Sequence, residues 1–195
     1  MKYIIYLILF TSTLSFSETK FYINGGMNLS KFMVDESSDI DPVSKNGYQW
    51  GIIVETSLEH RLSGVYGVMY NKKGSNLEYK KSELDNEAEF SYLSIPALLK
   101  YKRKWPLFIA IGTEVGYLVE GAIKPDIGEK LSRQEFSKMD FGLKGLVGLD
   151  FYEEEVMITF EATYGLMDIE FTEVETKISN FSIAGNVSFG LATLK

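Results

Sequence analysis

Apolar and polar residues alternate with a period of two over most of the chain after residue 20. This is the pattern of β-strands, in which successive side chains point to opposite faces. We predict eight strands, at residues 20–31, 47–58, 62–71, 89–102, 106–120, 138–152, 155–167 and 179–193. In each strand one face carries no charged residue, as in Trp50, Ile52 and Val54. The sequence therefore predicts an all-β protein with one barrel domain.

The opposite face of these strands is small and polar, rich in Gly, Ser and Asn. Small side chains suit the narrow inside of an eight-stranded barrel, and bulky aliphatic and aromatic side chains suit a lipid-facing belt. The pattern therefore favours an eight-stranded antiparallel up-and-down transmembrane β-barrel with its apolar face outside. The alternative is a soluble periplasmic lipocalin-like barrel that binds small lipids and turns its apolar face inward.

The connections between the predicted strands alternate in length. Three are tight, at residues 59–61, 103–105 and 153–154. The connections after the first, third, fifth and seventh strands are about 10 to 20 residues long, beyond the usual hairpin range. Outer-membrane barrels have short periplasmic turns and long external loops, so the tight turns are expected in the periplasm. An even number of strands then brings both termini to the periplasmic side.

Aromatic residues gather near the predicted strand ends. At the outer rim we expect Tyr48, Trp50, Tyr70, Tyr117, Phe141, Tyr164 and Phe181. At the inner rim we expect Phe21, Tyr101, Phe151 and Phe189, with Trp105 in a turn. Aromatic rings favour the level of the lipid headgroups, so the two groups predict two girdles.

Three residues interrupt the regular pattern. Phe32 and Phe90 have the wrong parity for a girdle unless a bulge intervenes. Pro96 has no N–H to donate, which predicts a bulge or a missing hydrogen bond near Ile95 and Pro96. An open sheet edge is too costly in hydrocarbon, so the last strand must pair with the first.

Residues 1–17 have the features of a secretory signal peptide, which leaves residues 18–195 as the barrel domain. Lys2 gives a positive start, residues 3–10 are uniformly apolar, and Ser15 and Ser17 provide a cleavage site before Glu18. This apolar run is shorter than the roughly 20 residues of a spanning helix. We expect export through a cleaved signal peptide and an integral location in the cell outer membrane.

Composition narrows the range of functions. A net charge of -7 argues against nucleic-acid binding. The chain has no Cys and one His, which rules out disulfides and thiolate sites and leaves little for zinc or His-based catalysis. We predict no enzymatic activity, with no catalytic, cofactor-binding or metal-binding residues and no cofactor.

Several charged residues are predicted to point into the barrel, namely Glu55, Glu114, Glu161, Lys100 and Lys144. Buried charges require partners, so an ion-pair network that fills the interior is expected. Two alternatives are acid–base catalysis by neighbouring carboxylates and narrow conduction through the lumen.

The other polar clusters are interpreted as solvated turns and loops. His60 lies in a tight turn beside Glu59 and Arg61. The first external loop carries an acidic group that lacks the spacing of a calcium loop, namely Asp35, Glu36, Asp39 and Asp41. The second external loop mixes both signs, with Lys72, Lys73, Lys80, Lys81, Glu78 and Glu83. Its lysines serve solubility or, alternatively, contact anionic sugars of outer-leaflet lipid.

Five ordered segments resemble the PorT-like group of outer-membrane β-barrel proteins. They are GGMNLS at 25–30, GVMYNKKG at 67–74, YLSIPALLKY at 92–101, GTEVGY at 112–117 and FEATYGL at 160–166. The chain differs at Thr163, where that group often has Arg, and it ends without a terminal aromatic residue. The resemblance implies an eight-stranded barrel in the outer membrane of Gram-negative bacteria, with no single activity.

Taken with the resemblance, these features predict a structural, anchoring or interaction role, either as an anchor with variable external loops or as an accessory to secretion or envelope assembly. The expected partners are outer-membrane lipid, the barrel insertion machinery and a protein that contacts the external loops, with no nucleic acid. An enzyme acting on lipid A would need a His, a Ser and an acid at the external rim, where the chain has no His.

Overall fold

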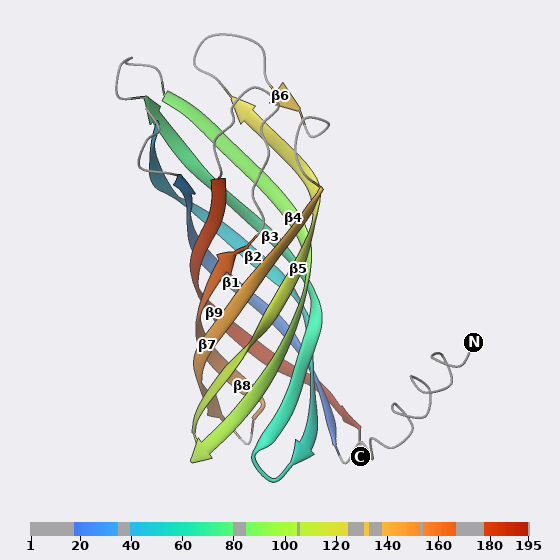
Figure 1. Cartoon of the computed structure of the whole chain (residues 1–195). Helices are drawn as coiled ribbons and strands as arrows, with labels where there is room; N and C mark the ends of the chain where they lie inside the picture. The colour runs from blue at the N-terminus through green and yellow to red at the C-terminus, as the bar shows by residue number, and fades with distance from the viewer. Residues whose placement is uncertain are drawn as a thin grey trace, which may run out of the picture.

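The computed structural model describes residues 18–34, 40–79, 85–104, 106–124, 131–132, 138–152, 154–166 and 178–194. Its strands are β1 (Thr19–Val34), β2 (Ile40–Glu59), β3 (Leu62–Tyr79), β4 (Asp85–Lys104), β5 (Leu107–Lys124), β6 (Leu131–Ser132), β7 (Met139–Phe151), β8 (Val156–Gly165) and β9 (Ile178–Leu194). All of them except β6 form a closed antiparallel ring, shown in Figure 1. The predicted eight-stranded barrel is therefore confirmed.

Closure of the ring takes place between the first and last strands, as expected. β1 pairs with β9 from Thr19 opposite Leu194 to Val34 opposite Ile178, with one register shift between Phe21 and Tyr22. The opposite side closes through the pairing of β4 with β5. The two-residue strand β6 adds to β5 alone, at Ala122 and Ile123.

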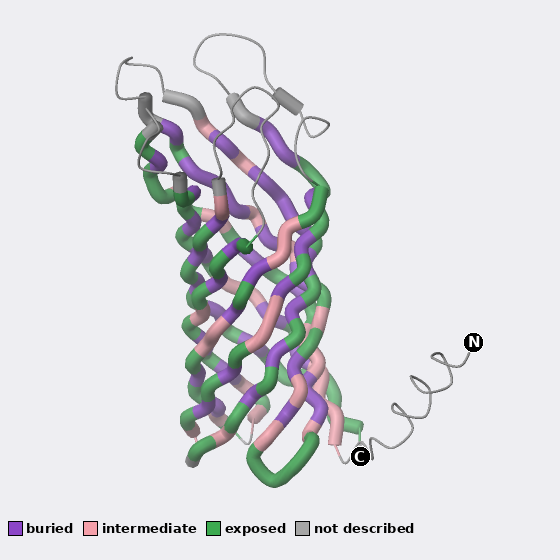
Figure 2. Tube along the Cα trace, viewed as in Figure 1, coloured by how far each residue is buried: buried purple, intermediate pink, exposed green. Residues whose placement is uncertain are grey.

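The apolar face of the strands lies outside the barrel. Ile111 is 71% exposed, Met27 70% and Phe160 66%, whereas Ser94 and Glu114 are buried inside. Figure 2 shows exposed and buried positions alternating along the strands. This orientation confirms the outward apolar belt and does not favour a lipocalin-like barrel, whose apolar face would be buried. The described residues include no helix long and apolar enough to cross a membrane.

The strands extend further at the end opposite the short turns, the end predicted to be external, than the sequence pattern predicts. β1 continues to Val34, β2 begins at Ile40, β3 continues to Tyr79 and β4 begins at Asp85. The long connections predicted after the first and third strands are therefore mostly strand, so that expectation was wrong there. Beyond the lipid-facing belt the outward face of a strand no longer needs apolar side chains, so the apolar alternation ends while the backbone ladder continues. The opposite ends have short turns, as predicted, such as His60–Arg61.

The interior is less uniformly polar than predicted. Phe32 and Phe90 are fully buried inside, with ring centroids 5.6 Å apart, and Tyr92 lies 6.5 Å from Phe90. Phe32 follows the regular inward alternation of β1. On β4, close to Phe90, the pairing with β5 changes register between Ser91 and Tyr92. Towards the short turns, a second apolar cluster comprises Tyr22, Phe108 and Met157. Apolar side chains thus fill part of the lumen.

Pro96 interrupts the ladder as expected. β3 pairs with β4 at Tyr66 opposite Ala97 and again at Met69 opposite Ser94, but not at Ile95 and Pro96 between them. The register is the same on both sides of the gap, so the irregularity is a missing pairing and not a bulge. A proline without an N–H accounts for this gap.

The predicted aromatic girdles point outward. At the outer rim the Tyr70 ring lies 5.8 Å from Trp50 and 6.2 Å from Tyr48. Tyr48, Trp50, Tyr117, Tyr164 and Phe181 are exposed, and Tyr70 and Phe141 are half-buried. At the inner rim Tyr101 and Phe189 are exposed, and Phe21 and Phe151 are half-buried. Trp105 lies outside the described residues.

Two glycines on opposite faces test how closely the inside is packed. A Cβ at inward-facing Gly51 would lie 2.7 Å from the Met69 Cα and would collide with the Val68 carbonyl oxygen, whereas at outward-facing Gly145 it would meet nothing within 4 Å. We expect Gly51→Ala to lower the free energy of unfolding by about 1–3 kcal/mol through overpacking. Gly145→Ala is expected to raise it by up to about 1 kcal/mol by restricting the unfolded chain.

Urea unfolding of both variants in the same detergent micelles measures the difference. Equal effects at Gly51 and Gly145 would contradict the tight inner packing.

Candidate functional site

The centre of the lumen holds a buried group of paired charges. Glu114 on β5 accepts hydrogen bonds from Lys144 on β7 at 2.7 Å and from Lys73 on β3 at 3.2 Å. Lys144 also forms an ion pair with Glu161 on β8 at 3.0 Å. The side chains of Glu114, Lys144 and Lys73 are at most 5% exposed. Charges this far from water persist only with such partners.

Polar side chains extend this central group across the barrel. Gln49 on β2 donates hydrogen bonds to Glu161 at 2.6 Å and to the Asn186 Oδ1 on β9 at 2.7 Å. The Asn186 Nδ2 in turn donates to the Thr159 hydroxyl at 3.4 Å. The network therefore links strands on opposite sides of the ring and fixes their spacing.

A second charged group lies near the short turns. The Lys100 ammonium contacts Glu55 at 2.9 Å and Asp150 at 3.3 Å, and it lies 3.8 Å from the centroid of the Phe108 ring. Lys102 forms ion pairs with Glu55 at 3.0 Å and with Glu154 at 2.5 Å. This group and the adjoining Tyr22, Phe108 and Met157 cluster occupy the lumen at this level.

A third group lies at the external end. Lys45 on β2 forms ion pairs with Glu87 at 2.5 Å and Glu89 at 2.7 Å on β4, and Lys72 on β3 contacts Glu89 at 3.2 Å. These side chains are more exposed than the central ones, so each pair contributes less to stability.

The structure confirms the inward positions predicted for Glu55, Glu114, Glu161, Lys100 and Lys144, and it places all of them in ion pairs. Lys73 was predicted in an external loop and in contact with solvent or lipid sugars, which was wrong. It lies on β3 and points inward, because β3 continues past the end of its apolar pattern. Lys73 lies two residues after the buried Asn71 and therefore on the same inward face of the strand, a signal that the sequence prediction did not use.

Asp150 and most of the interior aromatic residues were also missed, whereas Gln49 lies on the inward polar face, as predicted. Asp150 lies in the predicted strand with the parity of Gly148, but its contact with Lys100 joins strands far apart in the sequence. Which charges meet inside a barrel depends on strand tilt and stagger, which no local pattern reveals.

The remaining predicted polar residues lie in turns, in strands or outside the described residues. His60 is exposed in the turn between β2 and β3, as expected. Asp41 and Lys72 belong to β2 and β3, so their assignment to external loops was wrong. Glu78 also belongs to β3. The residues outside the described ranges are Asp35, Glu36, Asp39, Lys80, Lys81 and Glu83.

The chemistry of these groups is that of mutual charge neutralisation. Each buried carboxylate faces at least one lysine ammonium, so the ion pairs bind the strands to one another. Among the residues that the structure describes, no group of His, Cys, Asp or Glu side chains is arranged to hold a metal ion.

One of the acids lies in a turn, where its protonation affects stability. Glu154 adopts a positive φ of 72° between β7 and β8, which is uncommon for a residue with a side chain. Burial acts to raise the pKa of Glu154, but hydrogen bonds from Lys102 and Lys20 outweigh it and hold the pKa below the ordinary value of 4.5. A carboxyl group with a lowered pKa stabilises the folded state above its ordinary pKa, and that contribution disappears as pH falls through the folded value.

We therefore expect the free energy of unfolding to fall below pH 4.5, and to fall less steeply in Glu154→Gln. Denaturant unfolding over a pH series measures both slopes. Identical slopes would show that this turn makes no pH-dependent contribution.

Comparisons with known proteins agree with this geometry. Among solved structures, the chain is similar to Neisserial surface protein A, with a TM-score of 0.54 and 15% identity over 88% of this chain and 97% of that chain. It is also similar to Ail, the attachment invasion locus protein of Yersinia pestis, in complex with the heparin analogue sucrose octasulfate. The Ail match has a TM-score of 0.51 and 10% identity over 89% of this chain and 98% of that chain. At these identities the likeness shows the fold alone.

No curated protein matches the sequence. Residues 15–170 match the family described as outer membrane protein beta-barrel domain, which is most of the chain. The alternating strands, the closed ring and the outward apolar belt are general features of transmembrane β-barrels. The chain belongs to the outer membrane protein beta-barrel domain family.

Proposed function

We propose that this protein is an integral outer-membrane β-barrel with a structural, anchoring or interaction role and with neither enzymatic activity nor an open pore. The observation that carries the proposal is the filled lumen. Ion-pair groups around Lys100 and Glu114 and the buried aromatic rings around Phe90 occupy successive levels of it. An eight-stranded barrel has room inside for little more than its own side chains.

The proposed arrangement in the membrane follows from the two ends of the barrel. The short turns would face the periplasm, and the strand extensions of β2 to β5 would rise outside the cell, where they offer a surface to a protein partner. Residues 1–17 would direct export and be removed. Outer-membrane lipid would cover the outward apolar belt. The barrel insertion machinery would place the barrel in the membrane. The motifs at 25–30 and 92–101 support a more specific relation to the PorT-like group. With that relation, the protein would have an accessory role in secretion or envelope assembly.

Conductance across a planar lipid bilayer tests the closed lumen. The purified folded protein is expected to give no steady ion current at neutral pH, because the paired charges and aromatic rings leave no continuous aqueous path. A porin of similar preparation serves as the positive control. Steady single-channel steps that disappear when the barrel is unfolded would overturn the proposal of a closed structural barrel.

A further inference from the structure

Within the part of the chain that the structure describes, no neighbouring strand covers one edge at the end of β9. β8 pairs with β9 only as far as Val156 opposite Phe189, and the Gly190 N–H donates to the Glu155 carbonyl at 2.7 Å. β9 nevertheless continues to Leu194, bonded there to β1. Among the described residues, positions 191–194 therefore have a strand partner on one side only. An unpaired strand edge is a template for another extended chain.

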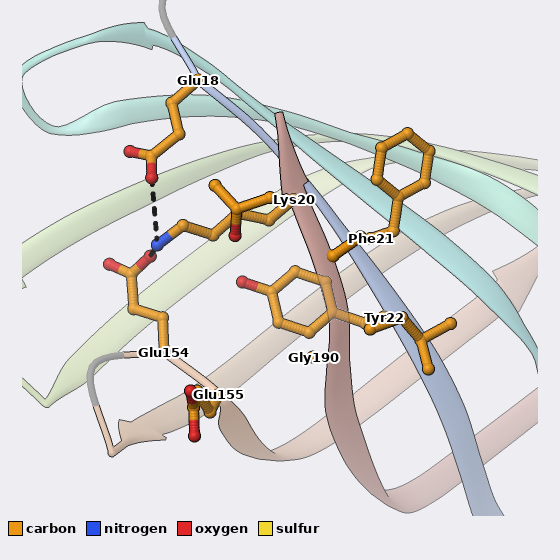
Figure 3. A pocket seen from close by; sticks show the side chains of 10 residues that line it. Glu18, Lys20, Phe21, Tyr22, Glu154, Glu155 and Gly190 are labelled. Carbon is orange, nitrogen blue, oxygen red and sulfur yellow. Dashed lines mark hydrogen bonds and ion pairs between the residues drawn. The ribbon is translucent and has the colours of Figure 1, made fainter. Parts of the chain in front are cut away.

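A cavity borders this edge at the end of the barrel with the short turns. Its volume is about 690 Å³, and it lies between the start of β1, the turn before β8 and the end of β9. Figure 3 shows Glu18, Lys20 and Glu154 on one side of it and Glu155 beside Gly190. The space beside the open edge is thus large enough to admit side chains of an added strand.

Negative charge predominates around this cavity. Its lining includes the carboxylates of Glu18, Glu154 and Glu155 but a single cationic side chain, Lys20. Lys20 forms ion pairs with Glu154 at 2.5 Å and with Glu18 at 3.8 Å, and Lys102 also pairs with Glu154, so the exposed Glu155 contributes most of the uncompensated negative charge. A segment with Lys or Arg side chains would complement this charge.

A buried hydroxyl also lies against the cavity. The Tyr22 side chain is 0% exposed, and its hydroxyl has no hydrogen-bond partner among the described residues. Figure 3 shows this hydroxyl directed towards Lys20 and Glu154. Because the hydroxyl has no exposed surface, an added strand contacts the backbone edge and the carboxylates and not this group.

From these observations we propose that the end of β9 binds an extended basic peptide segment of a periplasmic protein by strand addition. The backbone edge calls for a polypeptide, since only another strand satisfies a row of N–H and C=O groups. The carboxylates select basic side chains, and Leu191 and Leu194, about 60% and 59% exposed, favour apolar residues between them. The inference rests on the proposed function only in placing this end of the barrel in the periplasm.

Fluorescence anisotropy with the folded protein in phosphatidylcholine nanodiscs tests the inference. The probe is a short labelled peptide in which Lys and Val alternate, and two comparison peptides replace Lys by Glu or carry N-methyl groups on alternate residues. The Lys–Val peptide is expected to bind, and the comparison peptides are not. The double variant Glu18→Lys, Glu155→Lys should weaken binding about tenfold.

The matched control is Glu59→Lys, which reverses an exposed acid at the end of β2, beside the turn to β3, and should leave the affinity within about twofold. Absence of binding, equal binding of the N-methylated peptide, or an equal loss in Glu59→Lys would overturn the inference. Conductance and boiled versus unboiled gel mobility of the same samples report on the barrel itself. A folded, closed barrel that fails to bind the peptide therefore rejects the peptide site and leaves the proposed function standing.

Discussion

Replacing Glu114 with Leu is expected to lower the free energy of unfolding by about 3–5 kcal/mol, the usual cost of removing one partner from a buried ion pair. The substitution deprives Lys144 of a contact at 2.7 Å and Lys73 of one at 3.2 Å. Lys144 keeps Glu161 at 3.0 Å, but Lys73 is left buried without that carboxylate. Urea unfolding in detergent micelles, followed by tryptophan fluorescence, gives the free energy directly.

A double-mutant cycle separates the ion pair from the packing of the side chain. Adding Lys73→Met to Glu114→Leu removes the stranded ammonium, so the double variant is expected to recover part of the lost stability. Lys31→Met changes an exposed lysine on β1 and should alter stability by less than about 0.5 kcal/mol. If Glu114→Leu unfolds at the same urea concentration as the parent, the central network does not hold the barrel together.

The features most securely predicted from the sequence are those that lipid imposes. Inside a membrane each strand must present an apolar face outward, so apolar residues recur at every second position along a strand. Ile109, Leu143 and Ile158 are such residues on β5, β7 and β8. All three are exposed on the barrel surface, as predicted. The pairing of β1 with β9 was predictable for the same reason, because an unpaired backbone edge cannot remain in hydrocarbon.

The features that were missed lie where lipid imposes no constraint. Beyond the outer girdle the outward face of the strands no longer meets lipid, so the extension of β3 to Tyr79 carries no outward apolar pattern. Lys73 was assigned to a loop for this reason, although it is buried in the lumen. Phe32 and Phe90 fall on the face opposite to the aromatic girdles in the sequence pattern, and the structure explains this because both are buried inside the barrel.

The composition of the candidate site was predictable, but its pairing was not. Inward-facing acids and lysines follow from strand parity, and their need for partners follows from desolvation. That Lys100 meets both Glu55 and Asp150 depends on how β4, β2 and β7 are staggered around the ring. The stagger is a property of the whole closed sheet, so it becomes visible only in the structure.

Replacing Ile111 with Arg is expected to destabilise the barrel in a lipid bilayer by about 2–4 kcal/mol, because it places a charge at the middle of the lipid-facing belt. Ile111 is 71% exposed on β5, between Leu107 at the start of that strand and Tyr117 at the outer girdle. In aqueous solution an exposed residue tolerates such a change, so the cost measures contact with hydrocarbon and not packing within the protein.

Leu107→Arg is the matched control on the same face of the same strand. It lies at the rim, where Arg reaches the headgroups, so its cost is expected to be at most about 1 kcal/mol. Both free energies come from guanidinium unfolding in phospholipid vesicles. Equal costs for Ile111→Arg and Leu107→Arg would mean that the belt is not immersed in lipid, whereas a depth-dependent difference ties the outward apolar face to the membrane.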